Sequence, residues 1–251
     1  MTTVYVDAEQ SLGACTVIVD SDGSGFQVIA PDATIEVSGA QLTSITQAAM
    51  SLLNIQAGPP LKLAFFGDSN MLIRTGVTSA QTFPAQMAAA MSTANYSVFA
   101  VAGEASGDGL ARIQAIIDYA PTHVFIDFGV NDADTAKNVT GPQYEANMRE
   151  SIARFQAKGI TVIALSPIFI ARTGYLERQR DTYIPAWRKF SRVVGTIAVD
   201  CYTRHAAITM QSTRANFDAA VIDSSAELAA QHWSPSGNAL RVQWCKEAMG
   251  I

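Results

Sequence analysis

The sequence lacks several features that mark other classes of protein. Charged residues make up only 16% of its 251 residues, and the lysines and arginines form no basic stripe that could neutralise phosphates. We therefore expect no nucleic-acid partner. No apolar run approaches the roughly 20 residues of a membrane-spanning helix, so we expect no membrane span. The first ten residues contain neither a basic nor an apolar segment, which predicts no secretory signal and favours the cytoplasm, a virion or another assembly.

Cysteine is also scarce. Cys15, Cys201 and Cys245 lie far apart and show no CxxC spacing. This pattern argues against a zinc site and against a disulfide framework. We predict free thiols, packed mostly in the interior.

Apolar residues, in contrast, are plentiful at 49%, and Gly/Pro punctuation at residues 56–60 divides the chain. Residues 1–55 are predicted to form a small β-rich segment that ends in a helix at about residues 42–53. Its expected strands are residues 4–6, 16–19, 26–29 and 34–37, with a hairpin loop at 21–25. The segment is too small to be an enzyme, and we interpret it as an appendage, joined by the linker 56–60.

From Leu61 to Ile251 the pattern becomes buried strand, then helix, repeated. The apolar runs are residues 61–66, 96–102, 123–130, 161–166 and 196–201. The helical patterns are residues 83–91, 110–119, 143–158, 183–193 and 235–249. Continuous apolar runs are typical of strands covered on both faces, and the alternation predicts a three-layer α/β domain with a five-stranded parallel sheet.

Ligands bind at the carboxyl ends of the strands in such sheets. Three loops there carry polar groups, and a histidine precedes the last helix. They are Gly67-Asp68-Ser69-Asn70, Ser106-Gly107-Asp108, Gly129-Val130-Asn131-Asp132, and His232.

These residue types fit acyl transfer. A serine such as Ser69 needs a base to take its proton, and His232 can do so. The tetrahedral intermediate needs donors aimed at its oxyanion. A glycine N–H at Gly107 and the amide of Asn131 are suitable donors, because a glycine lets the backbone approach closely.

Each residue also has a structural interpretation. Ser69 could cap a helix, Gly107 could start one, and Asn131 could stabilise a turn. Gly103 is a second candidate donor, and we expect Asp132 to be a structural hydrogen-bonding residue.

Only three histidines can supply the base. His123 opens a strand, at the wrong end of the sheet for catalysis. His205 follows the fifth strand and is the second choice, although packing or surface exposure suits it better. His232 remains the first choice.

Residues from about 61 to the end, roughly three quarters of the chain, resemble the SGNH (GDSL) hydrolase superfamily. The matching blocks read GDSN at Ser69, ASGDGLARI at Gly107, GVND at Asn131 and HWSPSG at His232. The resemblance implies a flavodoxin-like three-layer fold and a serine esterase that needs no metal or organic cofactor. It assigns Ser69 as nucleophile, His232 as base, and Gly107 and Asn131 to the oxyanion hole. The implied substrate is a small-molecule or carbohydrate ester, with O-acetyl groups on a carbohydrate as the first hypothesis.

One position departs from the family pattern. The family usually has an acid three residues before the histidine, where this chain has Ala229. That carboxylate orients the imidazole and stabilises its charged form. Asp223 or Glu227 could replace it, a backbone carbonyl could leave a Ser–His dyad, or activity could be lost.

Two other functions compete with the esterase. The first is a catalytically weak or inactive module of a larger assembly such as a phage tail or virion, or a homo-oligomer, assembled through the N-terminal segment. The second, a flavodoxin-like cofactor binder, is disfavoured because the first loop, GDSNMLIRTG, is no Gly/Ser/Thr-rich phosphate cradle.

Overall fold

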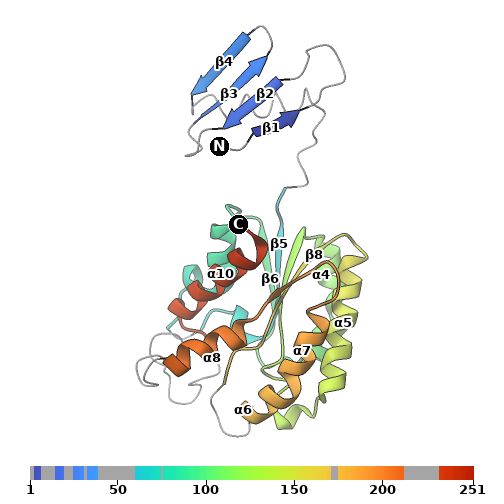
Figure 1. Cartoon of the computed structure of the whole chain (residues 1–251). Helices are drawn as coiled ribbons and strands as arrows, with labels where there is room; N and C mark the ends of the chain where they lie inside the picture. Colours follow the sequence, from blue (N-terminus) through green and yellow to red (C-terminus); the bar gives the residue numbers. More distant parts are fainter. Residues whose placement is uncertain are drawn as a thin grey trace. The chain divides into compact units, whose positions relative to one another are not determined.

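The computed structural model describes residues 60–74, 76–170, 175–211 and 232–251, together with the backbone of four strands within residues 3–38. The chain divides into two compact units, Met1–Pro60 and Leu61–Ile251. Figure 1 shows the elements of each unit.

The first unit contains an antiparallel sheet in which each strand pairs with the next along the chain. Its strands are β1 (Thr3–Val6), β2 (Cys15–Val19), β3 (Gly25–Ala30) and β4 (Ala33–Ser38). Each of the four expected strands is confirmed to within one residue at either end. The helix expected at about residues 42–53 lies outside the described residues.

A five-stranded parallel sheet forms the centre of the second unit, as predicted. Its strands are β5 (Leu63–Gly67), β6 (Tyr96–Ala100), β7 (His123–Asp127), β8 (Thr161–Leu165) and β9 (Thr196–Val199). Their order is β6-β5-β7-β8-β9, and every pairing is parallel. The carboxyl ends of all five strands therefore lie along the same edge of the sheet.

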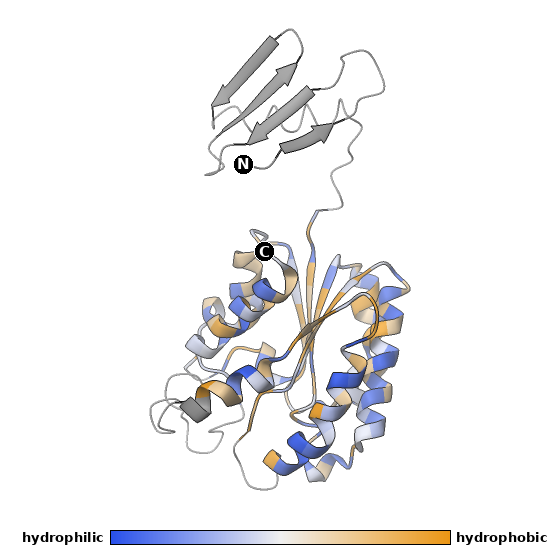
Figure 2. Ribbon diagram, in the orientation of Figure 1, coloured by the Kyte–Doolittle hydropathy of each residue, from blue (hydrophilic) through white to orange (hydrophobic). Residues whose placement is uncertain are grey.

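Helices cover both faces of this sheet. Alternate side chains of a strand point to opposite faces, so the strands contribute to two buried clusters. Leu63 and Phe65 of β5 pack in a buried cluster with residues of α2 (Phe83–Ala90) and α10 (Pro235–Met249). Cys201 of α8 (Cys201–Gln211) belongs to the same cluster. Figure 2 shows the hydrophobic colouring concentrated along the strands and on parts of the surrounding helices.

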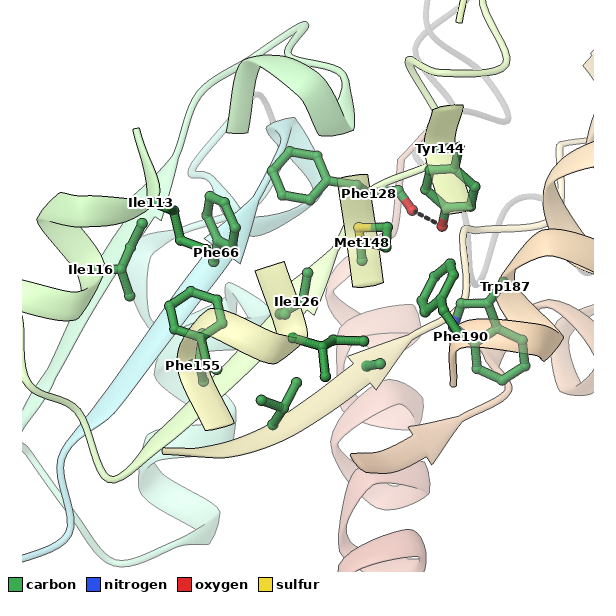
Figure 3. Packing of buried hydrophobic residues seen from close by; sticks show 14 of the residues in the cluster. Phe66, Ile113, Ile116, Ile126, Phe128, Tyr144, Met148, Phe155, Trp187 and Phe190 are labelled. Carbon is green, nitrogen blue, oxygen red and sulfur yellow. Dashed lines mark hydrogen bonds between the residues drawn. The ribbon is translucent and has the colours of Figure 1, made fainter. Parts of the chain in front are cut away.

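On the opposite face, Ala64 and Phe66 pack against α4 (Ile113–Tyr119), α5 (Gly141–Gln156) and α7 (Ile184–Phe190). Figure 3 shows this cluster, in which the Tyr144 hydroxyl donates to the Phe128 carbonyl at 2.9 Å. A buried aromatic core thus lies directly beneath the loop that follows β7.

The helices differ from the expectation at three places. The pattern expected over residues 110–119 is two helices, α3 (Ser106–Ala111) and α4, which meet at Arg112. The pattern over 183–193 begins earlier, with α6 (Tyr175–Arg178) and a π-helical segment (Gln179–Tyr183) before α7. Helix α8 was not predicted at all, although Asp200 accepts a hydrogen bond from Thr203 N at 2.8 Å, as an N-capping residue does.

Candidate active site

Ser69 begins a short 3-10 helix, η1 (Ser69–Met71), immediately after β5. The Asp68 carboxylate caps this turn by accepting from Asn70 N at 2.9 Å and from Asn70 Nδ2 at 3.1 Å. Gly67 is required just before it, because a Cβ there would lie 2.6 Å from the Asp127 carbonyl oxygen of β7. The close approach of β5 and β7 therefore places the half-buried Ser69 at the carboxyl edge of the sheet.

His232 lies near the C-terminal end of the unit in sequence and contacts Ser69 in the structure. Its Nε2 lies 2.9 Å from Ser69 Oγ, although the two residues are 163 positions apart. Ser234 caps α10 by accepting from Gly237 N at 3.1 Å, which fixes where that helix begins. The fold thus brings together the serine and histidine that the sequence indicated, within hydrogen-bond distance.

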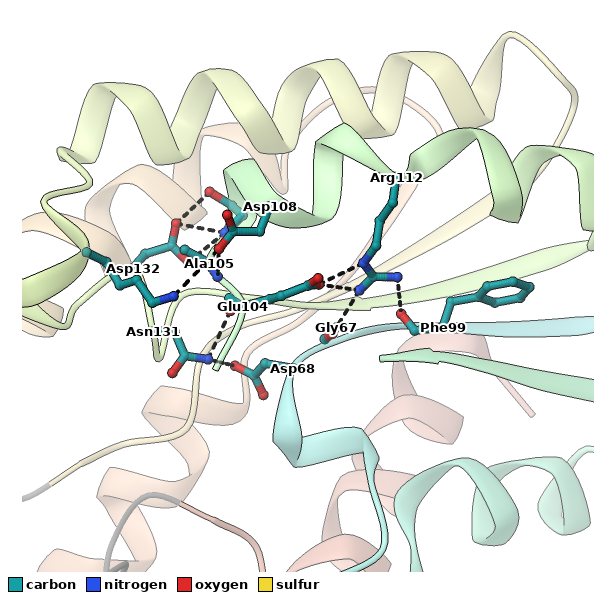
Figure 4. Close-up of polar contacts among 11 residues, drawn as sticks. Gly67, Asp68, Phe99, Glu104, Ala105, Asp108, Arg112, Asn131 and Asp132 are labelled. Carbon is teal, nitrogen blue, oxygen red and sulfur yellow. Dashed lines mark hydrogen bonds and ion pairs between the residues drawn. The ribbon is translucent and has the colours of Figure 1, made fainter. Parts of the chain in front are cut away.

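Asn131 follows β7 and lies beside the nucleophile loop. Its Nδ2 donates to the Glu104 carbonyl at 2.9 Å and to Asp68 Oδ2 at 3.2 Å (Figure 4). An amide NH₂ group has two hydrogens, so both are engaged in this structure. Asn131 is therefore tied to the residue that precedes Ser69.

Gly107 lies in the first turn of α3, whose N-terminus is held by Asp132. Ser106 N donates to both Asp132 carboxylate oxygens at 3.1 Å, and Ser106 Oγ donates to Oδ1 at 2.5 Å. Asp132 is fully buried, as a structural hydrogen-bonding residue would be. Because Asp132 is adjacent to Asn131, one loop positions both candidate oxyanion donors.

An ion pair that the sequence did not indicate supports these loops. Arg112 donates to the Glu104 carboxylate through Nε at 2.7 Å and Nη2 at 2.5 Å. Its Nη1 also donates to the Phe99 carbonyl at 3.0 Å, close to the end of β6 (Figure 4). Glu104 and Arg112 are eight residues apart, and their charges alone gave no signal that they meet here.

Burial dominates the electrostatics beneath Ser69. Burial and, to a smaller extent, the nearby Asp127 carboxylate together raise the pKa of Asp68 to about 7, although hydrogen bonds from Asn70 oppose the rise. Burial also raises the pKa of Asp132 to about 6, against the hydrogen bonds from Ser106. Two carboxyl groups around the site therefore titrate well above their ordinary range.

The other two histidines lie elsewhere. His123 is the first residue of β7, and pairs in register with Leu63 at the opposite edge of the sheet from Ser69. His205 is buried in α8 between aromatic side chains, with ring centroids 4.9 Å from Trp233 and 5.6 Å from Phe169. Burial lowers its pKa to about 4. His205 thus packs beneath the histidine loop.

Ala229 and the two candidate acids, Asp223 and Glu227, lie outside the described residues.

Among the residues with described structure, no group of three or more His, Cys, Asp or Glu side chains could hold a metal ion. In the same part of the chain, no helix combines the length and the apolar character needed to cross a membrane. Cys201 and Cys245 are free and buried, as predicted.

Solved structures with the same fold include several ester hydrolases. A catalytic mutant of an acetylxylan esterase from Geobacillus stearothermophilus matches with a TM-score of 0.62 at 19% identity, covering 78% of this chain and 97% of that one. The lipase/acylhydrolase from Enterococcus faecalis matches with a TM-score of 0.57 at 19% identity, covering 76% and 96%. A second acetyl xylan esterase gives 0.61 at 19% identity, covering 75% and 99%. Comparison with curated protein sequences finds no match.

These neighbours share the fold of the second unit, a three-layer α/β arrangement around a parallel sheet. The model of the GDSL-like lipase/acylhydrolase family matches residues 65–240, more than half of the chain. The chain belongs to this family and is by class an ester hydrolase.

Proposed function

We propose that the chain hydrolyses carboxylic esters through an acyl-serine intermediate, with Ser69 as nucleophile and His232 as general base. The observation that carries the proposal is the 2.9 Å contact between Ser69 Oγ and His232 Nε2. This distance is within the range for direct proton transfer to a base.

In the first half-reaction His232 takes the Ser69 proton as Oγ attacks the ester carbonyl carbon. The carbonyl oxygen becomes an oxyanion, to which the Ser69 and Gly107 N–H groups and the Asn131 amide donate. To do so, Asn131 gives up one of its two present acceptors. Its 3.2 Å contact with Asp68 is the longer, and so the one we expect to be exchanged.

The intermediate then collapses, and His232 returns the proton to the departing alcohol. In the second half-reaction His232 takes a proton from water, whose oxygen attacks the acyl carbon. Collapse breaks the bond between the acyl carbon and Ser69 Oγ, and His232 gives its proton to Oγ, which releases the carboxylic acid and restores the serine hydroxyl.

For the substrate we propose O-acetyl groups on a carbohydrate. The support is that two of the structural neighbours described above are named acetylxylan esterases. The hypothesis predicts faster turnover of acetyl esters than of long-chain esters, and release of acetate from acetylated xylan.

The test compares the wild-type chain with Ser69→Ala. We expect the wild type to hydrolyse p-nitrophenyl acetate and to be labelled by a fluorophosphonate on the peptide that contains Ser69. Ser69→Ala should lose both properties and keep its circular dichroism spectrum. Equal turnover by the two proteins would disprove the assignment of Ser69, and an unlabelled wild type without turnover would favour the inactive module.

A further inference from the structure

Arg241 of α10 lies in the core beneath two loops, the one that carries Ser69 and the one that carries His232, which are called the catalytic loops below. It is 1% exposed, and its guanidinium donates through Nη2 to the Asp127 carboxylate at the end of β7. Its Nη1 donates to the Asn70 carbonyl at 3.2 Å. The same guanidinium lies 5.5 Å from the centre of the Trp233 ring. Arg241 therefore contacts the residue after Ser69 and the residue after His232.

Arg74 makes a second connection between the same loops. It follows η1, five residues after Ser69, and its Nη2 donates to the Trp233 carbonyl at 2.6 Å. Trp233 is thus held at its backbone by Arg74, while its ring lies near Arg241. Arg74 thus lies just after the Ser69 loop and bonds to the backbone of the His232 loop. Arg241, on α10, contacts both loops.

We propose that Arg241 and Arg74 are positioning residues that hold the backbone beside His232 at a fixed distance from the backbone beside Ser69. The inference rests on the proposed esterase function of that pair. It deepens that function because this chain has Ala229 where the family usually places the acid that orients the histidine. Here, fixed loop backbones supply part of the orientation.

The proposed role of the two arginines is to place the catalytic side chains. Ser69 and His232 belong to loops 163 residues apart, so their contact depends on what holds the loops together. A displacement of about 1 Å in a reacting group can cost roughly 100-fold in rate. Arg241 is suited to this task because a guanidinium donates in several fixed directions, whereas an ammonium is a single point charge. Asp127 neutralises it in the core.

Three variants and one control test the proposal. Arg74→Ala removes the partly exposed tether, and Arg74→Lys restores one donor. For the buried tether, Arg241→Met alone would leave Asp127 unpaired in the core and threaten folding. The double change Asp127→Leu with Arg241→Met removes both charges at similar volume, which proteins often tolerate. Arg204→Ala is the matched control, because the described partners of Arg204, Glu247 and Trp244, both lie on α10.

We expect kcat for p-nitrophenyl acetate to fall roughly 10- to 100-fold in Arg74→Ala and in the double variant, with KM unchanged, since misplacement affects the chemical step. Arg74→Lys should recover part of the loss, and Arg204→Ala should match the wild type. Folded Arg74→Ala and double variants that keep kcat within twofold of the wild type would overturn the proposal.

The wild type and Ser69→Ala, measured in the same assay, separate this inference from the proposed function. If those two proteins do not differ, the esterase assignment fails. Crystal structures of the variants then decide the positional claim alone. A Ser69 Oγ to His232 Nε2 distance above 3.5 Å would support it, and an unchanged hydrogen bond in both would refute it.

Discussion

At the scale of single residues, Asn131 has the most demanding position in the site. Its amide is bonded to Asp68 and to the Glu104 carbonyl, yet the proposed chemistry needs one of its hydrogens for the oxyanion. Loss of one oxyanion donor typically costs about 10²–10³ in kcat. We expect Asn131→Ala to lower kcat by that amount with little change in KM for p-nitrophenyl acetate. A change in KM alone would instead make Asn131 a substrate contact.

A second residue-scale prediction concerns the acid missing at Ala229. We favour a Ser–His dyad whose imidazole bonds to a backbone carbonyl, because neither Asp223 nor Glu227 has the family's offset from His232. Glu227→Gln and Asp223→Asn should each keep most of the esterase activity, and Ala229→Asp should raise it. Steady-state kinetics on the three variants provide the measurement. A loss approaching 10⁴ in kcat, as for a triad without its acid, in a folded Glu227→Gln or Asp223→Asn would establish a displaced triad.

The buried carboxyls make stability depend on pH. In the folded protein the pKa of Asp68 is about 7 and that of Asp132 about 6, both raised from 3.8 chiefly by burial. These groups bind protons more tightly in the folded state than in the unfolded state. The free energy of unfolding therefore decreases as pH rises from about 4 to about 7. Asp132→Asn keeps an acceptor oxygen but does not ionise. Urea unfolding at several pH values should show a shallower decrease between pH about 4 and 6 in this variant; an unchanged slope would contradict the assignment.

At the scale of elements, the strands were predictable because both faces of the sheet are covered. Phe65 and Phe66 are both fully buried on opposite faces, so β5 reads as a continuous apolar run. The division between α3 and α4 was not predictable, because it coincides with the tertiary hydrogen bonds of Arg112 to Glu104 and Phe99.

The same limit applies to the site. The motif order indicated Ser69 and His232, since each lies next to an element boundary that the sequence marks. Arg241 and Asp127, however, look like ordinary helix and strand charges in the sequence. Only the packing of α10 against the sheet makes them a buried pair.

Helix α3 supplies a prediction about packing. A Cβ at Gly109 would lie 2.4 Å from Phe128 Cζ, and that ring is buried against Phe66. Gly109→Ala should therefore destabilise the protein by about 1–3 kcal/mol, as overpacking does, although alanine is the better helix former. At Gly107 a Cβ would approach only the Asn147 side chain, at 3.3 Å. Urea unfolding of Gly107→Ala is the matched control, and equal stability changes in the two variants would refute the packing argument.

At the scale of the whole molecule, the described site residues all come from one of the two units. Ser69, Gly107, Asn131 and His232 lie within Leu61–Ile251, and the family model matches residues 65–240. The structural neighbours are covered over 96% or more of their length by about three quarters of this chain. We therefore propose that residues 61–251 form the catalytic domain and that residues 1–55 are an appendage with another role.

This domain assignment predicts that residues 61–251 fold and act without the first unit. The described residues of the buried clusters on both faces of the parallel sheet all lie in this range, so the domain has a core of its own. We expect the shortened protein to unfold cooperatively and to hydrolyse p-nitrophenyl acetate with kcat within about twofold of the full chain. Acetate release from acetylated xylan should also be measured on both proteins. If the shortened protein loses acetate release but keeps its p-nitrophenyl acetate turnover, the appendage has a role in binding the polymeric substrate. If the shortened protein is unfolded, or folded without Ser69-dependent turnover, the first unit is part of the catalytic domain and the assignment is wrong.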